Sequence, residues 1–352
     1  MDQARRYKAF DEEFYQQHLS RVSRSFSFCI DQLGGPEKVY VGASYLICRI
    51  LDTVEDTHWE NTDQQNMVFN GFESFFNQPP SSVFVQEWLS LFQQDLVKPE
   101  EWKLLEDVAQ VFFDFHQFPD EIKQNIQQQV LTMAHGMRFF SEKKVEGQVC
   151  LRSLKEVNQY CFYVAGVVGE LLTKIFSLKY SQWRLTSYLN AFHFGLFLQK
   201  VNLLKDQLVD ENEGRNLVPD RSQVYKSIKA NALGSFRYLE SIPLELKNYR
   251  LFCAWSLFIG LQSLQVIQEG FKKNVVKKLS RTKTLILVQR IKSSISHPTE
   301  IKALFDQLLD STNLGDIEVS PVEVVSDHRE ILKMPYYSGD LTRNELVQLG
   351  VF

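Results

Sequence analysis

The sequence predicts an all-α protein. Apolar residues recur at intervals of three and four over long stretches of the chain, which is the pattern of helices that each bury one face. Few segments show the alternation of apolar and polar residues that is typical of strands. With 352 residues, of which 44% are hydrophobic and 23% are charged, the chain is long enough to bury a sizeable core.

Helical periodicity is found in the segments 39–54, 102–115, 122–140, 154–176, 188–209, 224–239 and 249–270. Breakers rich in Gly and Pro lie between them, at 34–36, 78–82, 118–120, 214–216 and 242–243. These breakers separate helices, because no segment before residue 309 has the composition of a long linker. We therefore expect one all-α domain over residues 1–309 and an irregular tail over residues 310–352, without a transmembrane anchor.

Composition and charge exclude several classes of function. A formal net charge of −4 gives no sign of a basic surface for nucleic acid. The five cysteines form no CxxC motif, which is typical of structural thiols in a reducing compartment. The polar N-terminal residues differ from a signal peptide, and no apolar run comes near the roughly 20 residues that span a bilayer. We therefore expect a monomeric cytoplasmic protein, at most peripheral to a membrane.

Two aspartate pairs are the strongest functional signal. Asp52 and Asp56 lie four residues apart in one apolar helical segment, and Asp206 and Asp210 repeat that spacing in another. Residues four apart share one helix face, where two carboxylates repel each other unless a cation lies between them. Ligand sets made of oxygen alone favour Mg²⁺, which keeps water and substrate phosphates in its shell. The pairs therefore predict a magnesium site for a phosphorylated substrate, with a solvated helix surface as the alternative.

Four blocks of sequence around these pairs resemble the squalene and phytoene synthase family, the head-to-head trans-isoprenyl diphosphate synthases. The blocks are Ser23-Arg-Ser-Phe26, Tyr45-Leu-Ile-Cys-Arg-Ile-Leu-Asp-Thr-Val-Glu-Asp56, Tyr160-Cys-Phe-Tyr-Val-Ala-Gly-Val-Val-Gly169, and the run from Gly195 to Asp210 that continues through Gly214-Arg215 to Pro219. Their order and spacing match the family from about residue 20 to about residue 283. The Leu-Asp-Thr-x-Glu-Asp form of the first acidic motif resembles the squalene synthase branch of the family.

The resemblance implies an isoprenoid synthase-type helical bundle around a central apolar cavity. It implies a Mg²⁺-dependent prenyltransferase that joins two farnesyl diphosphates to presqualene diphosphate, which is then reduced by NADPH to squalene. The side chains that it assigns to the metal are Asp52, Glu55, Asp56, Asn202, Asp206 and Asp210. Metal-held carboxylates suit this chemistry, because breaking an allylic C–O bond leaves charge on pyrophosphate that must be neutralised. Transient contact with a membrane is expected for release of the apolar product.

The resemblance also assigns residues to the substrate. Those expected to contact diphosphate are Ser23, Arg24, Arg49, Gln199, Asn202, Lys205 and Arg215. Tyr160 matches a family tyrosine that handles a proton or stabilises a cation, and the alternatives are surface ion pairs for the cations and a core position for Tyr160. Lys205 replaces the arginine that is usual in the family, so a point charge stands in place of a bidentate fork. The small residues Ala165, Gly166 and Gly169 predict close approach by a neighbouring helix or by a prenyl chain.

The reductive step has the weakest sequence support, because the chain has no GxGxxG motif after a strand. Val275-Val276-Lys277 resembles a segment linked with NADPH in squalene synthases, so the expected cofactor contacts are Lys277, Lys278 and Arg281. The chain departs from the family directly after this segment, and a solvated basic surface is the alternative. A dehydrosqualene or phytoene synthase, a hydroxysqualene synthase and a non-catalytic assembly-factor relative stay open on the sequence.

Overall fold

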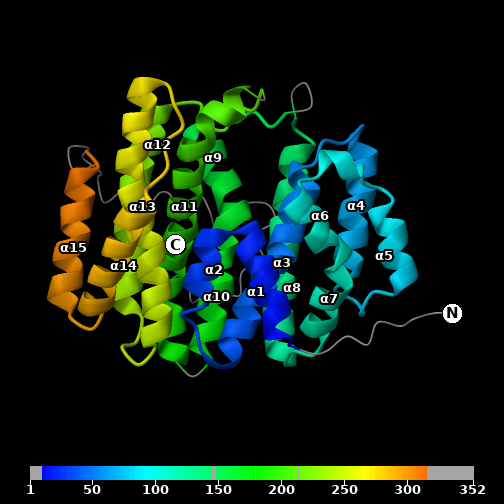
Figure 1. Cartoon of the computed structure of the whole chain (residues 1–352), viewed down its shortest axis with the longest axis horizontal. Helices are drawn as coiled ribbons and strands as arrows, with labels where there is room; N and C mark the ends of the chain where they lie inside the picture. Colours follow the sequence, from blue (N-terminus) through cyan, green and yellow to red (C-terminus); the bar gives the residue numbers. More distant parts are fainter. Residues whose placement is uncertain (1–9, 145–147, 179, 213, 315–352) are drawn as a thin grey trace. The chain divides into compact units, whose positions relative to one another are not determined.

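The computed structural model describes residues 10–144, 148–178, 180–212 and 214–314. Contacts between Cα atoms divide the chain into two compact units, Met1–Glu142 and Lys143–Phe352. Figure 1 shows the described residues as helices joined by connecting segments. Within the described ranges no strand forms, and one isolated parallel bridge links Cys150 to Asn216. The all-α prediction is confirmed for this part of the chain, whereas a single domain over residues 1–309 stays a prediction.

The first unit is built around one long helix, α3 (Gly35–Asp56), which packs against helices from both sides of it in the sequence. The other elements of the unit are α1 (Glu12–Val22), α2 (Arg24–Ile30), α4 (Thr62–Ser74), α5 (Ser82–Leu89), the 3₁₀ turn η1 (Gln94–Leu96), α6 (Pro99–Glu106), α7 (Val108–His116) and α8 (Asp120–Ser141). The face of α3 toward the core consists of Leu46, Ile47, Ile50, Leu51 and Val54, all fully buried. Burial of these side chains fixes which face of α3 carries the aspartates.

The helix boundaries in this unit differ from the sequence prediction in two ways. The predicted helix 102–115 is interrupted at Asp107, where α6 ends and α7 begins. Asp107 is held from outside this segment, because His18 Nε2 on α1 lies 3.2 Å from its Oδ2. The sequence prediction also missed α1, α2, α4 and α5, which are short or carry several polar residues and therefore show weak periodicity.

The second unit is centred on α11 (Ser181–Asn212), which contacts α9, α10, α12 and α13. Its elements in order are α9 (Leu154–Cys161), the π-helical turn η2 (Phe162–Gly166), α10 (Val167–Ser177), α11, α12 (Arg221–Ser241), α13 (Lys247–Lys273), α14 (Arg281–Ser294) and α15 (Pro298–Ser311). The predicted helix 154–176 is thus one helical path with a π turn inside it. Residues 315–352 of the predicted irregular tail lie outside the described residues.

The small-residue cluster packs helix on helix. A Cβ atom at Gly169 on α10 would collide with the backbone carbonyl of Ala191 on α11. A Cβ atom at Gly195 on α11 would in turn collide with the backbone carbonyl of Ala165 in the π turn. The two backbones therefore approach so closely that only glycine fits, which confirms close approach by a neighbouring helix.

Two segments have the length and composition of a membrane span. They are Leu154–Ser177, with mean hydropathy 1.2, and Lys247–Lys273, with mean hydropathy 1.4. The sequence prediction that no apolar run comes near bilayer-spanning length was therefore too simple. These windows are 78% and 67% buried inside the structure, as expected for core helices of the second unit.

Candidate active site

In the first unit, Arg49 lies between two carboxylates. Its Nη1 is 3.2 Å from Oδ2 of Asp52, one turn further along α3. Its Nη2 forms a short ion pair with Oε1 of Glu101, a buried residue on α6. Arg49 therefore links the acidic end of α3 to α6. Its side chain as a whole is 24% exposed.

Asp52 is the carboxyl group that its surroundings perturb most clearly. Burial raises the pKa of Asp52 to about 7, the neighbouring Arg49 opposes the rise, and the charge of Asp56 adds to it. Asp52 therefore holds a proton near neutral pH. A divalent cation would favour the ionised form, so this pair has the donor set and the electrostatic need of a cation site.

The remaining predicted residues of this unit have different surroundings. Asp56 is exposed at the end of α3, whereas Glu55 is buried, with 7% of the residue exposed. Ser23 caps α2, because its Oγ accepts a hydrogen bond from the backbone N–H of Phe26 at 3.3 Å. Arg24 is the first residue of α2, and its side chain lies outside the described part of the structure.

In the second unit, α11 carries the other acidic pair. Lys205 Nζ lies 3.1 Å from Asp206 Oδ2 and 3.2 Å from Asn202 Oδ1. Its ammonium group therefore contacts both Asp206 and the side-chain amide of Asn202, one helical turn earlier on α11. Asp206 remains 46% exposed. Lys205 thus forms the ion pair that was the alternative interpretation, and this pair places its ammonium group beside Asp206 of the second aspartate pair.

The second carboxylate of this pair is held by Arg215. Arg215 Nη2 lies 2.8 Å from Oδ1 of Asp210, whose side chain is 8% exposed, and the Arg215 backbone N–H donates to the Asp210 carbonyl at 2.8 Å. Gly214, which follows α11, has φ +81, a conformation that favours glycine. It lets the chain turn so that Arg215 lies beside Asp210. The backbone N–H of Asn216 then donates to the carbonyl of Val149 at 3.2 Å, in the bridge between Asn216 and Cys150.

The other predicted residues of this unit lie in the core or at its edge. Tyr160 is buried in the last turn of α9, directly before the π turn, and π turns occur often at functional sites. Gln199 and Asn202 are both half-buried on α11. Burial is compatible with either interpretation of Tyr160, so its role stays a prediction.

Sequence reasoning missed a buried polar cluster next to these residues. Lys200 is fully buried, and its Nζ donates to Asn231 Oδ1 on α12 at 2.6 Å and, by a short bond, to Ser227 Oγ. Asn231 Nδ2 donates in turn to His193 Nδ1 at 2.8 Å. A lysine inside the apolar run 192–204 was the available signal, because lysine is rarely buried without specific partners. Glu101 gave no such signal in the sequence.

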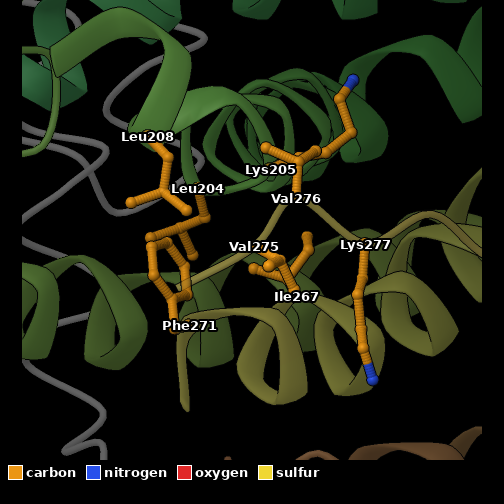
Figure 2. Close-up of a pocket in the computed structure, with 8 residues that line it drawn as sticks. All are labelled: Leu204, Lys205, Leu208, Ile267, Phe271, Val275, Val276 and Lys277. Carbon is orange, nitrogen blue, oxygen red and sulfur yellow. The ribbon is translucent and has the colours of Figure 1, made fainter. Parts of the chain in front are cut away.

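Of the predicted cofactor residues, Lys277 and Lys278 lie in the segment between α13 and α14, and Arg281 is the first residue of α14. A shallow apolar pocket is lined by Leu204, Lys205, Leu208, Ile267, Phe271, Val275, Val276 and Lys277. Figure 2 shows the apolar side chains gathered between α11 and α13, with the two lysines extending outward in different directions. Lys277 Nζ is 3.0 Å from Glu269 Oε2, whereas Lys278 and Arg281 are exposed. One predicted cofactor residue is thus placed beside the acidic helix.

The donor atoms on each helix suit Mg²⁺. On α3 and on α11 they are carboxylate and amide oxygens, the hard ligands that magnesium prefers. Among the described residues, no group of three or more His, Cys, Asp or Glu side chains is gathered closely enough to hold a metal ion. Each helix therefore offers an aspartate pair and would leave coordination positions for water and phosphate.

Comparison with known proteins identifies the family. The profile of the squalene/phytoene synthase family matches residues 19–223, which is more than half of the chain. The chain belongs to the squalene/phytoene synthase family. That match includes both aspartate pairs, Tyr160 and Arg215, and stops before the predicted NADPH residues.

Similar proteins include squalene synthases of animals and of a slime mould. The Homo sapiens squalene synthase is 31% identical over 234 residues, which cover 65% of this chain and 51% of the relative. The Dictyostelium discoideum squalene synthase is 33% identical over 211 residues, covering 59% of this chain and 47% of the relative. The chain thus matches about half the length of these curated relatives.

The fold is shared with solved structures of the family. A structure of TcSQS in complex with the ligand BPH1237 superposes with TM-score 0.70 at 20% identity, covering 91% of this chain and 97% of that one. A dehydrosqualene synthase in complex with a ligand superposes with TM-score 0.50 at 19% identity, covering 81% and 96%. The isoprenoid synthase-type fold predicted from the sequence is confirmed, while its central cavity stays a prediction.

Proposed function

We propose that this chain is a Mg²⁺-dependent prenyltransferase that condenses two farnesyl diphosphates head to head. The observation that carries the proposal is the pair of acidic helices. α3 presents Asp52 and Asp56 with Arg49, and α11 presents Asp206 and Asp210 with cations beside both. Alternating acids and bases on a helix face suit a metal diphosphate, because the metal and the cations share the charge of the phosphate oxygens.

Different side chains of this chain would have different roles in the reaction. When bound, Mg²⁺ supplies the positive charge that makes pyrophosphate a better leaving group. Arg49 and Arg215 each have an aspartate partner in the structure, and their planar guanidinium groups can turn to diphosphate oxygens as a bidentate fork. Lys205 adds a point charge beside Asp206. Tyr160, buried at the end of α9, is the candidate for handling the proton lost during condensation.

We further propose that presqualene diphosphate is the intermediate and squalene the final product. The second step loses the remaining pyrophosphate, and NADPH would supply the hydride that completes squalene. Lys277, Lys278 and Arg281 are cations that suit the phosphates of a dinucleotide. Lys277 lines a pocket together with Leu204 and Lys205, which directly precede Asp206 on α11. Magnesium, NADPH and farnesyl diphosphate are therefore the proposed small-molecule partners of a cytoplasmic, monomeric enzyme that contacts membranes transiently.

One observation favours a product that needs no NADPH. Lys277, the residue best matched to the NADPH segment, is already paired with Glu269 at 3.0 Å. A cofactor phosphate would have to compete with the Glu269 carboxylate for Lys277, although an exposed ion pair of this kind is weak. A dehydrosqualene or hydroxysqualene synthase is therefore the second candidate. A non-catalytic relative is disfavoured because all four aspartates are present.

The test is to incubate the purified chain with farnesyl diphosphate and Mg²⁺, with and without NADPH, and to identify the products by mass spectrometry. Squalene with NADPH and presqualene diphosphate without it would support the main proposal. Dehydrosqualene or hydroxysqualene in both samples would replace it with the second candidate. If farnesyl diphosphate yields no product, the chain does not catalyse this condensation.

A further inference from the structure

Helix α14 presents apolar side chains to solvent. Leu285 and Ile286 are 58% and 59% exposed. The side of α14 that faces the core of its unit is formed by Leu287, Val288 and Ile291, all buried. The two exposed residues therefore do not contribute to the core, although a leucine or an isoleucine gains most from leaving water. Two adjacent exposed aliphatic residues on one helix are a candidate contact surface.

The outward side of α14 has cations along both of its edges. At 100° per residue, Leu285 and Ile286 lie on either side of the line that points away from the buried face. Uncharged polar residues share this central region, namely Thr282, Gln289 and Ser293. Arg281 and Lys292 border one edge, and Lys283 and Arg290 border the other. We call these nine residues the outer face of α14.

The region around this face is strongly basic. Residues 271–294 contain eight Lys and Arg and no Asp or Glu, although the whole chain has a formal net charge of −4. The nearby Glu269 has its pKa lowered first by Lys277 and then by Lys283 and Lys273, so these cations are grouped in space. Within the described residues, the cations that take part in no ion pair include Lys272, Lys273, Lys278, Arg281, Lys283 and Lys292. Lys273, Lys277 and Lys283 therefore lie near one another beside Glu269, and Lys283 also belongs to the outer face of α14.

We propose that the outer face of α14 docks on the surface of an anionic lipid bilayer. Lysine and arginine along both edges would contact lipid phosphates, while Leu285 and Ile286 would enter the boundary between headgroups and acyl chains. Charge complementarity favours an anionic membrane over a neutral one. A nucleic acid would satisfy the cations but would leave the central aliphatic pair exposed to water. The proposal depends on this surface alone and not on the reaction that the chain catalyses.

The apolar part of the proposal is tested by vesicle co-sedimentation of the full chain. We expect binding to vesicles that contain an anionic phospholipid, weaker binding to phosphatidylcholine alone, and loss of binding as salt rises. Leu285→Gln/Ile286→Gln should weaken binding at least about tenfold, because the aliphatic pair no longer enters the bilayer. The matched control is Val83→Gln/Leu244→Gln, which replaces aliphatic residues that are 66% and 59% exposed elsewhere.

The charged part is tested with a second matched pair. Lys283→Gln/Lys292→Gln should weaken binding to anionic vesicles about thirtyfold, since each cation near such a surface contributes roughly a factor of five. Lys247→Gln/Lys302→Gln removes the same charge from other exposed positions of the second unit and should have a much smaller effect. Circular dichroism and thermal unfolding would check that the variants remain folded.

Insertion itself can be measured with Gln289→Trp, a probe at the centre of the outer face. We expect its fluorescence to shift to the blue with anionic vesicles and to stay unchanged with heparin, a soluble polyanion. The proposal would be overturned by an absence of binding to anionic vesicles, or by equal losses in the α14 variants and their controls. Binding to heparin without any binding to vesicles would likewise overturn it. Because every readout is binding, these results do not depend on which product the chain makes.

Discussion

Arg49 offers a way to separate a structural role from a role in catalysis. Its guanidinium pairs with Asp52 on α3 and with Glu101 on α6, and the Glu101 side chain is only 9% exposed. Replacing Arg49 by Met keeps the length of the side chain but leaves Glu101 a largely buried carboxylate. Lys98 Nζ, 3.9 Å from the same oxygen, is its remaining cationic neighbour.

The expected loss of stability can be estimated from this geometry. Breaking a fully buried pair by removing one partner costs about 3–5 kcal/mol. Arg49 is 24% exposed and Lys98 lies within reach, so we expect Arg49→Met to lower the free energy of unfolding by about 2 kcal/mol. In Arg49→Met/Glu101→Gln the buried charge is gone, so most of this loss should be recovered. Turnover should stay low in both variants, because neither can bind diphosphate through residue 49.

The assay combines urea unfolding with measurement of pyrophosphate release from farnesyl diphosphate. Glu101→Gln alone is the control, and it should retain turnover because Arg49 is still present. The reasoning is wrong if Arg49→Met is as stable as the unmodified chain, or if the double variant is less stable than the single one. Recovery of turnover together with stability in the double variant would show that Arg49 has a structural role only.

Further predictions concern Mg²⁺ binding, stability and turnover. Because the pKa of Asp52 is about 7, Mg²⁺ must displace a proton from this carboxyl group near neutral pH. The apparent Mg²⁺ affinity measured by calorimetry should therefore fall about tenfold from pH 8 to pH 6, and this pH dependence should be lost in Asp52→Asn. A Mg²⁺ affinity of the intact chain that does not change with pH would refute the prediction. In the metal-free chain the raised pKa means that this group's contribution to stability declines as pH rises from about 4 to about 7. Gly169→Ala should lower the free energy of unfolding, measured by urea unfolding, by about 2 kcal/mol or more. The control Gly42→Ala, whose new Cβ would lie 3.7 Å from Leu19, should be neutral or stabilising in the same assay. Arg215→Gln should slow turnover more than Arg215→Lys, and equal rates for both would exclude a diphosphate contact.

Much of the fold could be predicted because its long helices carry clear periodicity. The segments 39–54, 122–140 and 249–270 all lie inside observed helices, since each buries one broad apolar face. Helix α14 was missed because Leu285 and Ile286 are apolar yet exposed, which obscures the amphipathic pattern. The break at Asp107 was missed because its partner, His18, is 89 residues away in the sequence. Local patterns do not contain such contacts.

The residues of the candidate site were predicted through spacing and resemblance, but their ion-pair and hydrogen-bond partners were not. Spacing of four placed Asp52 with Asp56 on one helix face, and the structure adds a pKa of about 7 for Asp52, which is raised mainly by burial and further by the charge of Asp56. The pairing of Arg49 with Glu101 joins residues 52 positions apart, so no local signal could predict it. Lys200 lay inside a recognised block, but its hydrogen bonds to α12 depend on packing between helices. Tertiary contacts thus supply what helix periodicity omits.

The central claim is that both acidic helices serve one Mg²⁺-dependent condensation. The most direct measurement is the rate of pyrophosphate release from farnesyl diphosphate by the intact chain and by Asp52→Asn and Asp206→Asn, with folding of each variant checked by circular dichroism. The account predicts Mg²⁺-dependent release by the intact chain and a loss of at least about a hundredfold in each variant. Release at the rate of the intact chain in both variants would contradict it.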